Sequence, residues 1–202
     1  MSDKNIFAER EHWLEEEYFR KKNQELIEKM HERQAHEAEL QKMSEATGIN
    51  DQETLEALQA LGFTSDTVRL LHLVPLVEVA WVEGGVADRE RQMIFKVAQS
   101  RGVEPASAAH QQLSQWLAEK PSERFFENTL HAIRVVLELL SAEQRAASRR
   151  DLIAYCSQIA EVVEGGILGR GRITDEERML IAHIATEIGQ GREETVRQII
   201  SR

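Results

Sequence analysis

An internal repeat constrains the fold of this chain more than any other feature of its sequence. Residues 79–91 read Val-Ala-Trp-Val-Glu-Gly-Gly-Val-Ala-Asp-Arg-Glu-Arg, and a related pattern spans residues 162–178. The Glu-Gly-Gly part recurs 81 residues later and the part after it 87 residues later, so the second turn carries a six-residue insertion at 167–172. Apolar residues at helical spacing flank both turns. The repeat therefore predicts two helix–turn–helix units in one domain, over about residues 68–102 and 150–189.

The rest of the sequence also predicts helices. Between residues 68 and 82, 12 of 15 residues are apolar when Pro75 is counted, which indicates a helix at the centre of a core. We expect this helix to open at residues 64–66 and to run on to residue 83, with a kink at Pro75. Over residues 126–140, large apolar residues are spaced four, three, four and three apart, as on one face of a helix. No stretch alternates apolar and polar residues as a strand does, so the predicted class is all-α.

A charged arm, residues 1–46, precedes the helical domain, which we place at residues 51–202. The arm contains 12 acidic and 8 basic residues and neither glycine nor proline. Its apolar residues form two short stripes, Phe7, Leu14 and Tyr18 on one face and Phe19, Leu26 and Met30 on another. Neither stripe is long enough to form the continuous apolar seam that a coiled coil needs. We therefore expect a long solvated helix that is either mobile or available to a partner.

Composition excludes several classes of protein. The formal net charge of −10 argues against nonspecific binding of nucleic acid, which needs a basic surface. A single cysteine, Cys156, forms neither an internal disulfide nor a cysteine metal cluster, and we expect it to be buried. No signal-peptide core and no apolar run of about 18 residues is found, so we predict a cytoplasmic protein without a transmembrane segment.

Acidic residues recur around the two turns. Glu90 and Glu177 have a local explanation as helix caps, with a full capping box at Thr174 and half of one at Ala87. Glu83 and Glu164 have none, because a carboxylate in the last turn of a helix faces the negative end of its dipole, at a cost of about 0.3–1 kcal/mol. Arg91 and Arg178 could offset that cost. A divalent cation is the other explanation, since hard cations gather carboxylate oxygens. The candidate metal ligands are Glu83, Asp88, Glu90, Glu164, Asp175 and Glu177.

The string over residues 79–91 resembles the signature of the TerB-like (tellurite-resistance) domain, roughly V-A-x-A-D-G-x-[IV]-x-x-x-E. The resemblance covers about residues 65–190, with Glu83 where the family usually has aspartate. It implies a duplicated all-helical bundle and an acidic site proposed to bind metal. It also implies a role in bacterial stress response, often at the inner membrane surface or beside partner proteins, and it does not imply catalysis.

The start of the arm is similar to the opening of the zeta-type inhibitor of the bacterial ATP synthase. The similarity lies in Phe7, Arg10, Glu11, Leu14, Glu15 and Tyr18. It implies that the arm itself acts on a protein partner.

Two functional hypotheses result. The first is a non-enzymatic TerB-like module that binds a divalent cation (Ca²⁺, Mg²⁺, Mn²⁺ or Zn²⁺) or a protein partner, with peripheral membrane association open. The second is a regulator or adaptor that acts through the arm, with the helical domain as its carrier. An enzyme has the least support, because no titratable pair stands at a spacing typical of acid–base or nucleophilic catalysis.

Overall fold

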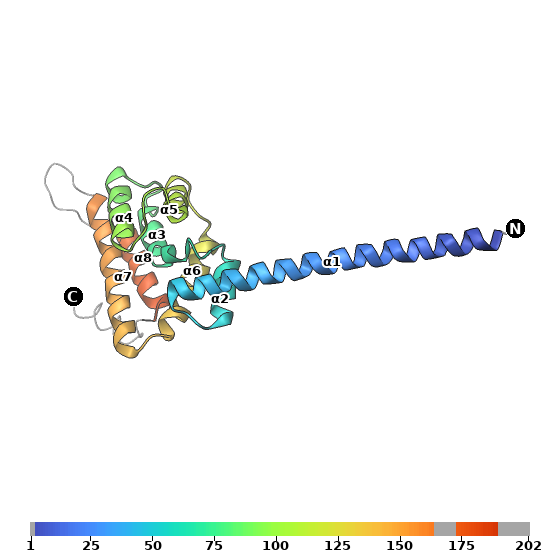
Figure 1. Ribbon diagram of the computed structural model, residues 1–202. Helices are drawn as coiled ribbons and strands as arrows, with labels where there is room; N and C mark the ends of the chain where they lie inside the picture. The colour runs from blue at the N-terminus through green and yellow to red at the C-terminus, as the bar shows by residue number, and fades with distance from the viewer. Residues whose placement is uncertain (1–2, 164–172, 190–202) are drawn as a thin grey trace. The chain divides into compact units, whose positions relative to one another are not determined.

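A computed structural model describes residues 3–163 and 173–189 (Figure 1). Within these ranges the chain forms eight α-helices and one 3₁₀ helix, and no strand, which confirms the predicted all-α class. The elements are α1 (Asp3–Thr47), α2 (Gln52–Ala60), η1 (Val68–Leu73), α3 (Val74–Ala80), α4 (Asp88–Ser100), α5 (Ala108–Ala118), α6 (Glu123–Glu138), α7 (Ala142–Val163) and α8 (Asp175–Glu187).

The chain divides into two compact units, Met1–Gln41 and Lys42–Arg202. The predicted long charged helix is present as α1, which is continuous over 45 residues and whose last turns belong to the second unit. The helix ends where Gly48 adopts a left-handed φ of 73° and its N–H donates to the Ser44 carbonyl at 2.7 Å. Glycine takes this conformation without steric cost, which explains its place directly after the helix.

The second unit is built around α3, which contacts α4, α6, α7 and α8 (Figure 1). Leu76, Val77 and Val79 on α3 are fully buried, as the apolar run predicts. The expectation of one helix from residues 64–66 to residue 83 is corrected. The segment forms η1 and then α3, with Pro75 in the first turn of α3, where its missing N–H costs no helical hydrogen bond. The helix ends at Ala80, before a turn.

The amphipathic helix predicted over residues 126–140 is α6. Ser122 caps it by accepting from the Phe125 N–H at 3.2 Å, and four of its apolar residues at the predicted spacing are buried. A reciprocal capping box between Ser141 and Gln144 begins α7. Next to this box, Arg145 donates hydrogen bonds to three carbonyl groups at the end of α6, those of Leu137, Glu138 and Leu140. Arg145 therefore compensates the unpaired end of one helix from the start of the next.

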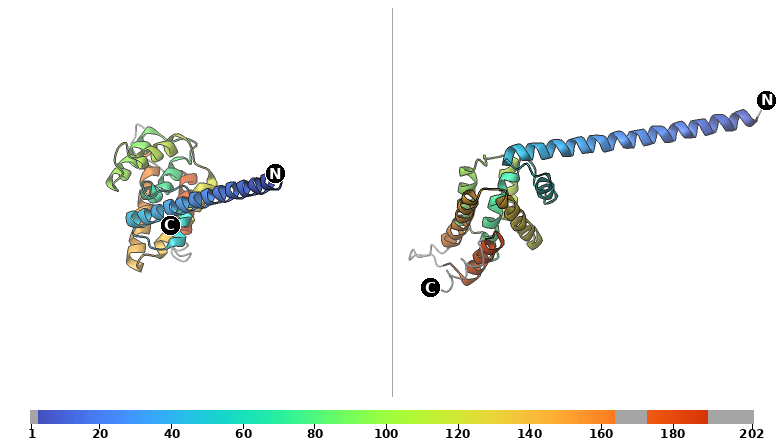
Figure 2. Two further views of the ribbon diagram at one scale, coloured as in Figure 1. Left: turned by 45° about the vertical axis from the view of Figure 1, so that its right-hand side comes forward. Right: turned by 90° about the horizontal axis from the view of Figure 1, so that it is seen from below.

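The predicted repeat appears at the level of whole helices. The pairs α3–α4 and α7–α8 are each in contact, and Figure 2 shows α7 (orange) beside α8 (red). Helices α4 and α8 each have 13 residues and begin 87 residues apart. Equivalent positions also behave alike. The buried pairs are Ile94 with Ile181 and Ala98 with Ala185, and the helices are followed by Gly102 and Gly189, with φ of 82° and 79°. Glu164, Gly165, Gly166 and the insertion at 167–172 lie outside the described residues.

Candidate functional site

The first Glu-Gly-Gly turn positions side chains that hold neighbouring helices. The Trp81 indole N–H donates to the Trp116 carbonyl at 2.8 Å, and the Arg91 guanidinium donates to the Leu117 carbonyl at 2.8 Å. Both acceptors lie at the end of α5, so two residues of the motif fix that end. Arg91, a candidate for offsetting the charge of Glu83, makes this contact instead. Glu83 itself is exposed beside Gly84, whose φ is 88°.

Glu90 and Glu177 are the third residues of α4 and α8, and both are buried, with 3% and 1% exposure. The Ala87 N–H donates to Glu90 Oε2 at 2.7 Å, which is the half capping box expected from alanine at this position. In the second copy the Thr174 N–H donates to Glu177 Oε2 at 2.8 Å, and Thr174 Oγ1 accepts from the Glu177 N–H at 3.2 Å. The two carboxylates thus perform the same structural task in the two copies.

The repeat also brings these carboxylates within electrostatic range of each other. Burial raises the pKa of Glu90, the hydrogen bond from the Ala87 N–H lowers it, and the charges of Glu177 and Glu83 raise it, so that the resulting pKa is about 7. The charges of two other candidate carboxylates, Glu83 and Glu177, therefore act on Glu90.

The other three candidate metal ligands are either exposed or outside the described residues. Asp88 and Asp175 are exposed, and Asp175 forms an ion pair with Arg178 at 3.0 Å. Glu164 lies outside the described residues. Within residues 3–163 and 173–189, no group of three or more His, Cys, Asp or Glu side chains is arranged to hold a metal ion. The predicted cation site of six carboxylates therefore stays a prediction.

Glu78 is an acidic residue that the sequence reasoning missed. It lies on α3, and its Oε2 atom is buried without a hydrogen-bond partner in the described part of the chain. Burial raises the pKa of Glu78 to about 7, with Glu123 and Glu127 adding to the rise and Lys120 opposing it. The only signal in the sequence is a single carboxylate inside an apolar run.

Cys156 on α7 is fully buried, as expected. Burial raises the pKa of its thiol well above the ordinary value, and the charge of Glu78 adds to this effect. The thiol is therefore neutral and inaccessible, which argues against a role as a nucleophile.

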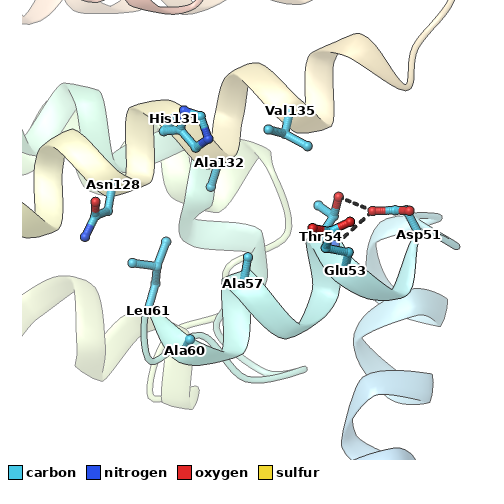
Figure 3. A pocket seen from close by; sticks show the side chains of 10 residues that line it. All are labelled: Asp51, Glu53, Thr54, Ala57, Ala60, Leu61, Asn128, His131, Ala132 and Val135. Carbon is cyan, nitrogen blue, oxygen red and sulfur yellow. Dashed lines mark hydrogen bonds between the residues drawn. The ribbon is translucent and has the colours of Figure 1, made fainter.

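A groove of about 490 Å³ lies between α2 and α6 (Figure 3). Small apolar side chains, among them Ala57, Ala60 and Ala132, form its floor, and Asn128 and His131 add polar groups along α6. At the other end, Asp51 accepts from the Thr54 N–H at 2.9 Å and caps α2. The groove forms because alanines at these positions leave room between two packed helices.

Large apolar side chains are exposed mainly on α1. Six of the eight such side chains among the described residues lie there, namely Trp13, Tyr18, Phe19, Leu26, Ile27 and Met30, each 52–61% exposed. Leu26 and Met30, with Lys29 and Arg33, line a shallow groove along the helix. Exposed aromatic and aliphatic side chains gathered on one element are typical of a protein-binding surface.

Comparison with known proteins gives no further guidance, since no family model, curated protein or solved structure was found to match the chain. Among the described residues, no helix has both the length and the apolar content needed to cross a membrane.

Proposed function

We propose that this chain is a non-enzymatic binding module of the TerB-like kind, which acts through contact with another protein. The observation that carries the proposal is the exposure of six large apolar side chains along α1. The described part of the chain leaves these side chains more than half exposed, so their apolar surface is available to a partner. Burying each on a partner contributes about 1.5–3 kcal/mol when burial is complete.

The second unit is suited to carry the arm because it is a well-packed helical domain. Helix α3 lies at the centre of its core, and its helices are capped at Ser122, Ser141 and Thr174. The resemblance to TerB-like domains extends the proposal to bacterial stress response of the tellurite-resistance type, in the cytoplasm or at the inner membrane surface.

Substitutions on the exposed face of α1 test the proposal. The full chain would be immobilised, and proteins retained from a bacterial lysate, together with added untagged copies of the chain, would be quantified by mass spectrometry. Phe19→Ser with Leu26→Ser should remove a defined set of retained proteins. Asn23→Ser with Gln24→Ser, which changes two exposed polar residues of the same helix, is the matched control. Equal retention by both variants and by the wild type would contradict the proposal.

A second candidate function is the binding of a divalent cation, supported by the recurrence of carboxylates around the two turns and by the influence of the Glu83 and Glu177 charges on Glu90. A cation would stabilise the charged form of Glu90 and remove the repulsion among the three carboxylates. Titration calorimetry with Ca²⁺, Mg²⁺, Mn²⁺ and Zn²⁺ tests it. Glu83→Gln with Glu90→Gln should abolish the heat of binding, while the exposed neighbour Glu176→Gln should retain it. No heat for any of the four ions with the wild type would end this candidate.

A further inference from the structure

The charged residues on the two sides of Tyr18 and Phe19 in α1 have opposite signs. Three acidic residues, 15–17, precede the pair, and three basic residues, 20–22, follow it. Glu15 stands four residues before Phe19 and Lys22 four residues after Tyr18, so helical periodicity puts both positions one turn from the pair, at angles between those of residues 18 and 19. By the same periodicity, Lys4 and Glu11 stand on this face before the pair, and Lys29 and Arg33 stand on it after the pair.

We propose that the partner of this face is a second copy of the chain, whose α1 packs antiparallel across it with the two-fold axis between Tyr18 and Phe19. The inference rests on the proposed function, since it names the partner of the arm. In this arrangement Glu15 of each copy lies opposite Lys22 of the other. The aromatic pairs, each 60% exposed in the single chain, cover one another at the axis.

Charge selects the antiparallel direction. In a parallel pair in register, each residue lies opposite its own copy, so Glu15 would face Glu15 and Lys22 would face Lys22. The antiparallel pair replaces these two repulsions by two attractions. A closed two-fold contact of this kind is the commonest symmetry of soluble oligomers.

A charge-swap series in the full chain tests the pairing by sedimentation equilibrium. Glu15→Lys and Lys22→Glu should each weaken the dimer roughly tenfold, because each turns two attractions into two repulsions. The double variant should recover wild-type association, and an equimolar mixture of the two single variants should form heterodimers. Glu15 and Lys22 are seven residues apart and do not pair within one helix, so recovery has no intrahelical explanation. Glu28→Lys, on the opposite side of α1, is the control and should leave association unchanged.

A thiol crosslink tests the direction. Cys156 is buried, so an introduced cysteine is the accessible thiol. A short bifunctional reagent should link two copies of Tyr18→Cys near the axis. It should not link two copies of Arg33→Cys, which would be about 43 Å apart along the pair at 1.5 Å per residue. Linking at both positions would indicate a parallel pair and overturn the inference. A wild-type chain that stays monomeric at 100 μM, a concentration on the order of a weak Kd, would also overturn it. In that case, proteins lost on Phe19→Ser with Leu26→Ser would still support the proposed function.

Discussion

Glu90 and Glu177 occupy the same position, the third residue of α4 and of α8, and both are buried carboxylates that accept the N–H of the residue preceding their helix. They are separated by 87 residues in the sequence, yet the charge of Glu177 contributes to the raised pKa of Glu90. The duplication thus repeats a helix cap and also places the second cap where its charge acts on the first.

The helix caps of the two copies differ in one hydrogen-bond acceptor, and this difference can be tested. Thr174 completes its capping box with Oγ1, whereas Ala87, with a similar backbone (φ −69°, ψ 153°, against −66°, 163°), has no side-chain acceptor. Ala87→Thr should therefore stabilise the protein by about 0.5–1 kcal/mol, and Thr174→Ala should destabilise it by a similar amount. Urea unfolding monitored by circular dichroism measures both. Destabilisation by Ala87→Thr would contradict the equivalence of the two caps.

The two glycines of the first turn should respond differently to alanine. Gly84 has a φ of 88°, whereas Gly85 lies outside the left-handed region, and an added Cβ meets no atom within 4 Å at either position. Gly84→Ala should cost about 1–2 kcal/mol of stability, because only its backbone conformation is strained. Gly85→Ala should be neutral or slightly stabilising. Thermal unfolding of the two variants measures this difference. Equal losses of stability would show that the left-handed conformation of Gly84 is not the cause.

The buried carboxylate of Glu78 should make stability fall as pH rises. Its pKa is about 7 in the folded chain and near the ordinary value of 4.5 in the unfolded chain, so the folded state binds the extra proton between these limits. Stability due to this group is present below pH 4.5 and lost as pH rises through 7. Glu78→Gln should therefore be about 1–2 kcal/mol more stable than the wild type at pH 8, allowing for solvent screening, and nearly equal at pH 4.5.

Chemical denaturation across pH 4.5–8 measures this difference, and taking it against the wild type cancels other titrating groups. The exposed Glu104→Gln is the control for loss of one negative charge and should show no such trend. A gain in stability from Glu78→Gln that is the same at all pH values would show that the carboxylate does not titrate in this range.

Arg145 should contribute more to the stability of the fold than an exposed arginine of the same helix. Its guanidinium donates to three carbonyls at the end of α6, whereas Arg150 is exposed on α7. Arg145→Met keeps most of the aliphatic chain and removes the hydrogen bonds, and we expect it to cost about 1–2 kcal/mol. Arg150→Met should change stability by less than about 0.5 kcal/mol. Equal effects of the two substitutions in urea unfolding would contradict this assignment.

Sequence reasoning was most successful where a repeat or a local hydrogen bond determines the structure. The offset of 87 residues predicted that α4 and α8 correspond, and the Thr174–Glu177 spacing predicted a cap that the structure contains. It failed over residues 68–83, because an apolar run does not reveal that the chain forms a 3₁₀ turn before Pro75. Glu78 and the groove between α2 and α6 were missed because both depend on which helices pack together.

The proposal that the arm binds another protein is tested most directly by photo-crosslinking in bacterial cells that express the full chain. A photoreactive phenylalanine analogue at Phe19 should yield a crosslinked product of discrete mass, either a dimer of the chain or a complex with a second protein. The same analogue at Gln24, about 140° around the helix from Phe19, should yield much less of it. Product at neither position, or equal product at both, would contradict a specific protein-binding face on α1.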